Sequence, residues 1–99
     1  MKPYTQYVNY MLRQVFARDG SLKNRTIAEV ENDTICLDIL RGRSEQERNI
    51  LREIVSASEN VPMREAVRRF ALDNQMDEKD TWSLVRKTTE EIARRKGLI

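Results

Sequence analysis

Histidine is absent from the sequence, cysteine occurs once, and no long run of apolar residues is present. Histidine is the most common general base in enzymes and a frequent zinc ligand, so its absence argues against both roles. A bilayer-spanning helix needs ~20 apolar residues, and the start of the chain lacks the small-residue cleavage site of a signal peptide. We therefore expect a cytoplasmic protein that does not enter membranes, binds no metal or cofactor and is not an enzyme.

Glycine and proline are also scarce, with three and two copies. No glycine-rich phosphate loop is present, and Gly20, Gly42 and Gly97 fall where helices would end. Pro62 suits the first position of a helix, because the backbone N–H that proline lacks would have no hydrogen-bond partner within the helix there. The length of 99 residues is sufficient for one domain with one core.

Apolar residues recur at three- and four-residue spacing, which is typical of amphipathic helices. Thr26 with Glu29, and Ser44 with Glu47, match the capping-box pattern of helix starts. Residues 34–40 also alternate as a strand would, but a single short strand would have no partner. The five predicted helices cover Thr5 to about Arg18, Thr26 to Arg41, Ser44 to Ser58, Pro62 to about Asn74, and Asp77 to Lys96. We predict an all-α, single compact domain over 1–99, made of a helical pair (1–43) and a three-helix, helix-turn-helix-like half (44–99).

The same periodicity assigns side chains to the interior or the surface. Tyr7 and Ile27 fall on apolar faces, whereas Asn9 falls on the polar side of its helix. Cys36 lies in an apolar stripe and is expected to be a core residue, with a reactive thiol as the alternative. Trp82 is expected in the core as well, with an exposed partner anchor as the alternative.

The C-terminal half contains a sequence pattern that is similar to a known family. The residues that match are Ser44-Glu45-Gln46-Glu47-Arg48-Asn49-Ile50-Leu51-Arg52, Ala66-Val67, Phe70-Ala71, Met76 and the final helix. This half resembles the C-terminal promoter-reading domain of bacterial sigma factors, which implies a two-helix DNA reader over 62–96. The whole chain also looks like short uncharacterised proteins of Firmicutes phages and integrative mobile elements. That likeness implies a genetic setting and no particular activity.

Basic residues line one edge of each of the last two helices. Arg86 and Lys87 would enter the groove of double-stranded DNA, while arginines of the preceding helix would contact the backbone. The alternative is that these are solvated faces that pair with Glu65, Glu90 and Glu91. The candidate nucleic-acid-binding residues are Arg64, Arg68, Arg69, Ser83, Arg86, Lys87 and Arg94.

Charge is unevenly distributed along the chain. Residues 44–80 hold six basic and nine acidic residues, whereas 81–99 hold five basic and two acidic ones. The acidic residues gather around the turn between the last two helices, which carries no glycine. They would suit docking on a basic protein surface or mimicry of phosphates. These candidate protein-binding residues are Asp73, Asp77, Glu78 and Asp80.

Three functions therefore stay open. The first is a non-enzymatic, helix-turn-helix-like DNA-binding accessory or regulatory protein of a phage or mobile element. The second is a protein-binding module, such as an anti-CRISPR-like inhibitor of a host defence nuclease or a partner of RNA polymerase. The third is a structural or dimerisation domain, with a homodimer as one arrangement.

Overall fold

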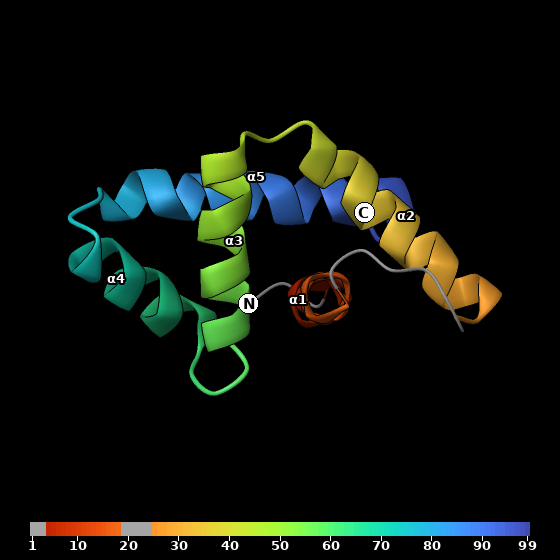
Figure 1. Ribbon diagram of the computed structural model, residues 1–99, viewed down its shortest axis with the longest axis horizontal. Helices are drawn as coiled ribbons and strands as arrows, with labels where there is room; N and C mark the ends of the chain where they lie inside the picture. The colour runs from red at the N-terminus through yellow and green to blue at the C-terminus, as the bar shows by residue number, and fades with distance from the viewer. Residues whose placement is uncertain (1–3, 19–24) are drawn as a thin grey trace.

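Five α-helices make up the regular structure of the described residues, 4–18 and 25–99, of the computed structural model (Figure 1). They are α1 (Tyr4–Ala17), α2 (Ile27–Arg41), α3 (Glu45–Ala57), α4 (Met63–Asp73) and α5 (Glu78–Lys96). The predicted all-α fold is confirmed. Residues 34–40 lie inside α2, so the strand interpretation is wrong. The predicted turn at Gly20 lies outside the described residues.

Side-chain caps set the starts of α2, α3 and α5. The hydroxyl of Thr26 accepts from the Glu29 N–H at 3.1 Å, and the Glu29 carboxylate accepts from the Thr26 N–H at 3.3 Å. The side chain of Thr26 and then its backbone N–H, both acting on the carboxylate, lower the pKa of Glu29. Ser44 and Glu47 form the same reciprocal pair, so both capping boxes are confirmed. Pro62 precedes α4 as its N-cap instead of serving as its first residue.

Helix α5 lies along the length of the molecule and packs against each of the other four helices (Figure 1). Only one side of α5 is buried, and three of the residues on that side are threonines. Thr81 and Thr89 donate their hydroxyls to carbonyl oxygens one turn earlier in the chain, each at 2.8 Å. Thr88 accepts from Arg43 at 3.1 Å. With their polar atoms satisfied, these threonines can pack in a core.

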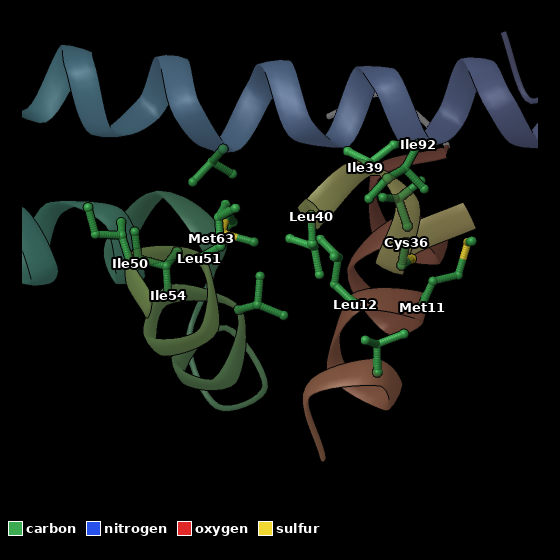
Figure 2. Packing of buried hydrophobic residues seen from close by; sticks show 14 of the residues in the cluster. Met11, Leu12, Cys36, Ile39, Leu40, Ile50, Leu51, Ile54, Met63 and Ile92 are labelled. Carbon is green, nitrogen blue, oxygen red and sulfur yellow. The ribbon is translucent and has the colours of Figure 1, made fainter. Parts of the chain in front are cut away.

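The hydrophobic core lies beneath this buried side of α5, and Figure 2 shows side chains of the other helices gathered there. Cys36 is fully buried in it. Burial raises the pKa of the Cys36 thiol to about 12, which keeps the thiol protonated and unreactive at neutral pH. The expected core role of Cys36 is therefore confirmed. The labelled core residues are Met11, Leu12, Cys36, Ile39, Leu40, Ile50, Leu51, Ile54, Met63 and Ile92.

Several side chains of α1 and α2 lie on a different side from the one predicted. Asn9 is only 6% exposed, because α1 is packed by α2, α3 and α5 and so has more than one covered side. Ile27 is 90% exposed, since it lies at the open first turn of α2. Tyr7 is 42% exposed and its hydroxyl accepts from Asn32 at 3.1 Å.

An ion pair accounts for a further buried polar residue, Asp33 of α2. The guanidinium of Arg25 contacts the Asp33 carboxylate at 2.9 Å, and each side chain is 4% exposed. Asp33 therefore occupies an inward position that the hydrophobic pattern assigned to apolar neighbours. Buried charges are retained in proteins when they are paired in this way. The pairing was not predicted, because Arg25 stood in a segment expected to be a linker.

The turn between α4 and α5 closes without glycine. Met76 N–H donates to the carbonyl of Ala71 at 2.8 Å, and Gln75 N–H donates to that of Leu72 at 3.4 Å. This hydrogen-bond pattern is a Schellman motif, which places one residue in the left-handed region. Gln75 takes that position with a φ of 54°. Glutamine pays a steric penalty there that glycine would avoid.

We expect Gln75→Gly to raise the free energy of unfolding by about 0.5–1 kcal/mol. Relief of a left-handed strain of about 1–2 kcal/mol exceeds the flexibility cost of glycine, about 0.5–1 kcal/mol. Urea denaturation measures the change. Gln46→Gly, the same substitution inside α3, is the matched control and should be destabilising. Equal destabilisation by both variants would contradict the role assigned to Gln75.

Candidate nucleic-acid interface

Arg64 of α4 and Arg86 of α5 line one pocket of about 550 Å³. We call it the α1–α4–α5 pocket. Both arginines are exposed, and neither makes an ion pair with another described residue. The structure thus brings together one predicted cation from each of the two helices. The residues that line the α1–α4–α5 pocket are Tyr4, Thr5, Asn9, Pro62, Met63, Arg64, Trp82, Val85, Arg86, Thr89 and Glu90.

Arg68 and Arg69 are instead held by an acidic neighbour on their own helix. Both contact the carboxylate of Glu65 at 3.0 Å, one turn earlier in α4. Hydrogen bonds from Arg68 and then Arg69 lower the pKa of Glu65. Glu65 is one of the partners that the solvated-face alternative named. Their charge is therefore partly compensated, unlike that of Arg64.

Ser83 and Lys87 lie on the other flank of α5, in a second hollow with Asp80 and Glu91. Glu91 pairs with Arg43 at 2.9 Å, so its partner comes from the α2–α3 connection and not from the cations of α5. Lys87 is exposed and makes no ion pair with a described residue. Lys87 and Arg86 thus occupy opposite flanks of the helix.

The last turns of α5 carry three more cations with different surroundings. Arg95 contacts Asp38 at 2.9 Å and Lys96 contacts Glu31 at 3.3 Å, so both tie α5 to α2. Arg94 is exposed and has no such contact within the described part of the chain. Arg94 lies on the solvent-facing side of α5, between the side that carries Arg86 and the side that carries Lys87. The α5 outer face consists of Ser83, Arg86, Lys87, Glu90 and Arg94.

The acidic candidates surround the α4–α5 turn at the opposite end of α5. All four are exposed. Asp77 caps α5, accepting from the Asp80 N–H at 3.0 Å. Beside them Leu72 is 77% exposed, which is unusual for a leucine in a helix with a buried face. The turn therefore presents an exposed leucine close in sequence to four exposed carboxylates, those of Asp73, Asp77, Glu78 and Asp80.

Comparison of the chain with protein-family models, curated proteins and solved structures found no match. Within residues 4–18 and 25–99, none of the helices combines the length and the apolar character needed to cross a bilayer.

Three polar side chains near these surfaces were not singled out in the sequence. Asn9 faces the α1–α4–α5 pocket from α1, and Arg43 joins the α2–α3 connection to α5. Arg48 donates to the carbonyls of Arg43 and Leu40, which holds the start of α3 against the end of α2. Each role depends on a contact between helices, and no local pattern marks such a contact.

The Glu65 cluster should contribute stability that depends on pH. Because its folded-state pKa is lowered, the contribution is present above the unfolded-state value of 4.5 and is lost as pH falls through the folded-state value. We expect the stability advantage of the wild-type protein over Glu65→Gln to shrink as the pH is lowered below 4.5. Chemical denaturation across pH 3–7 measures it. A constant or widening difference would contradict the assignment.

Proposed function

We propose that this protein is a non-enzymatic DNA-binding protein that contacts duplex DNA through the α5 outer face, with α4 beside it. One observation carries the proposal. Helix α5 packs every other helix on one side, and no described residue covers the opposite side, where Arg86, Lys87 and Arg94 are exposed. Exposed cations without carboxylate partners are the groups that neutralise phosphates.

The dimensions of the helix suit a groove. At 1.5 Å per residue, the 19 residues of α5 span about 28 Å. The major groove of B-DNA is wide enough to admit an α-helix. Arg86 and Lys87 extend from opposite flanks, so each can reach a different groove wall. Arg64 adds a cation from α4 on the Arg86 side, where it would contact the backbone.

The charge pattern also determines which part of α5 would contact the DNA. Asp77, Glu78 and Asp80 lie at the start of α5 and would repel phosphates if that end entered the groove. The middle and last turns carry the unpaired cations, so they make the contact. This differs from the common helix-turn-helix geometry, in which the first turn of the recognition helix approaches the bases. A regulatory role in a phage or mobile element rests on the resemblance stated above.

Binding to a random duplex, measured as a function of salt, tests the proposal. The wild-type protein should bind with a steep negative dependence of log affinity on log salt. Arg86→Ala, Lys87→Ala and Arg94→Ala should each reduce that slope by about one. Arg41→Ala is the matched control, because Arg41 is an exposed arginine at the end of α2 that lines a different hollow, together with Val15 and Phe16 of α1.

Two results would overturn this function. One is the absence of duplex binding at low salt. The other is an equal loss from Arg41→Ala and from the three α5 variants, which would show that net charge alone, and not this face, determines binding.

A second candidate is binding to a basic protein surface through the acidic α4–α5 turn, as in an inhibitor of a nuclease or a partner of RNA polymerase. The observation that favours it is the 77% exposure of Leu72, which is next in sequence to the acidic residues of this turn. Protein interfaces commonly combine apolar side chains with a polar, solvent-accessible periphery. The carboxylates would provide the electrostatic complementarity.

Asp77→Asn combined with Asp80→Asn distinguishes the two candidates. Asparagine caps a helix about as well as aspartate, so the start of α5 is preserved while two negative charges are removed. If α5 binds DNA, this double variant should bind duplex several-fold more tightly, because repulsion of phosphates is reduced. Unchanged duplex affinity, together with lost binding to a basic protein, would favour the second candidate.

A further inference from the structure

The α1–α4–α5 pocket has the composition of a small-molecule site. Its volume of about 550 Å³ falls within the usual range of ligand pockets, about 300–1,000 Å³. Apolar side chains that include Met63 of α4 and Trp82 and Val85 of α5 form part of its wall, and six of the eleven lining residues are polar or charged. We propose that this pocket binds a nucleotide, meaning a planar heteroaromatic ring that carries a phosphate. The proposal goes beyond duplex binding, since most of the pocket lies off the α5 outer face.

Asn9 supplies the first reason. Its side chain is more than nine-tenths buried, yet its Oδ1 has no hydrogen-bond partner among the described residues. A buried amide oxygen without a partner destabilises the free protein. Asn9 lines the pocket and its Oδ1 is covered in the free protein, so a rotation of the side chain would bring this oxygen to a donor on the ligand. A carboxamide both donates and accepts, which matches the edge of a nucleobase.

Aromatic rings supply the second reason. Trp82 and Tyr4 both line the pocket, and both remain partly exposed. The core position expected for Trp82 is therefore wrong in part: its indole packs against the core at one side and borders the pocket at the other. Bases stack on such rings with little dependence on base identity.

Charge supplies the third reason. Arg64 and Arg86 line the pocket, and a guanidinium can hold a phosphate through two parallel hydrogen bonds. Glu90 also lines it and is a negative group among these cations. Its carboxylate can accept from an exocyclic amine of a base, but it disfavours a chain of phosphates lying against it. The set therefore fits one ring and one phosphate better than a polyphosphate.

Such a nucleotide could be free in solution or a unit of a single strand, and the experiment has an arm for each. Calorimetric titration of the full-length protein uses AMP, GMP, CMP and UMP in one arm and a short single-stranded oligonucleotide in the other. Trp82 is the only tryptophan of the chain, so stacking on it should quench the intrinsic fluorescence. We expect binding and quenching in at least one arm. Binding of mononucleotides identifies a free ligand, and binding of the oligonucleotide alone identifies a strand.

Asn9→Leu separates a ligand role from a structural one. Leucine has a similar shape and no unpartnered oxygen, so the variant should unfold at a temperature a few degrees higher than the wild-type protein. Its nucleotide affinity should fall about tenfold, as expected for one lost hydrogen bond. A residue important only for folding would not change stability and affinity in opposite directions.

Arg64→Ala and Arg86→Ala test the phosphate contact at exposed positions where folding is not at risk. Each should weaken nucleotide binding several-fold, and Arg41→Ala, the matched control outside the pocket, should not. The proposal is overturned if neither arm shows binding, or if Asn9→Leu, Arg64→Ala and Arg86→Ala all bind as the wild-type protein does. Duplex binding with its salt dependence is measured separately, so either function can fail while the other stands.

Discussion

The structure depends on the burial of one side of α5 against all four other helices. That side combines the apolar residues Val85, Ile92 and Ala93 with threonines whose hydroxyls bond within the helix or to Arg43. Satisfied hydroxyls let the helix backbones approach without leaving polar groups unpaired. Among the remaining helices, α1 packs on α2, α3 packs on α4, and α1 also contacts α3. Without the α5 surface, the α1–α3 packing would be the main contact between these two helix pairs.

The same packing of α5 also creates the two surfaces that are proposed to bind ligands. A helix buried on one side must expose the other, and in this chain the exposed side carries the cations of the α5 outer face. Where α1 and the start of α4 meet the flank of α5, their side chains enclose the α1–α4–α5 pocket instead of filling it. Arg86 belongs to both surfaces, since it lies at the boundary between the outer face and this flank.

Helix positions and their ends could be predicted because they depend on neighbours in the chain. Thr26 and Ser44 each cap a helix through a residue three positions later, so a short pattern is sufficient. The side that each helix buries was harder to predict. Asn9 and Asp33 are buried although they are polar, because α1 has several packing partners and Arg25 neutralises Asp33. Periodicity identifies one apolar face and does not report additional neighbours.

The candidate site could likewise be predicted from the sequence only in part. The sequence by itself determined which helices are basic, where the acidic turn lies and that no histidine is available for catalysis. Only the tertiary structure decided that Arg64 and Arg86 share a pocket with Asn9, and that Lys87 lines a different hollow with Arg43. The physical reason is range: caps and helical periodicity act over a few residues, whereas a binding surface forms where distant segments pack together.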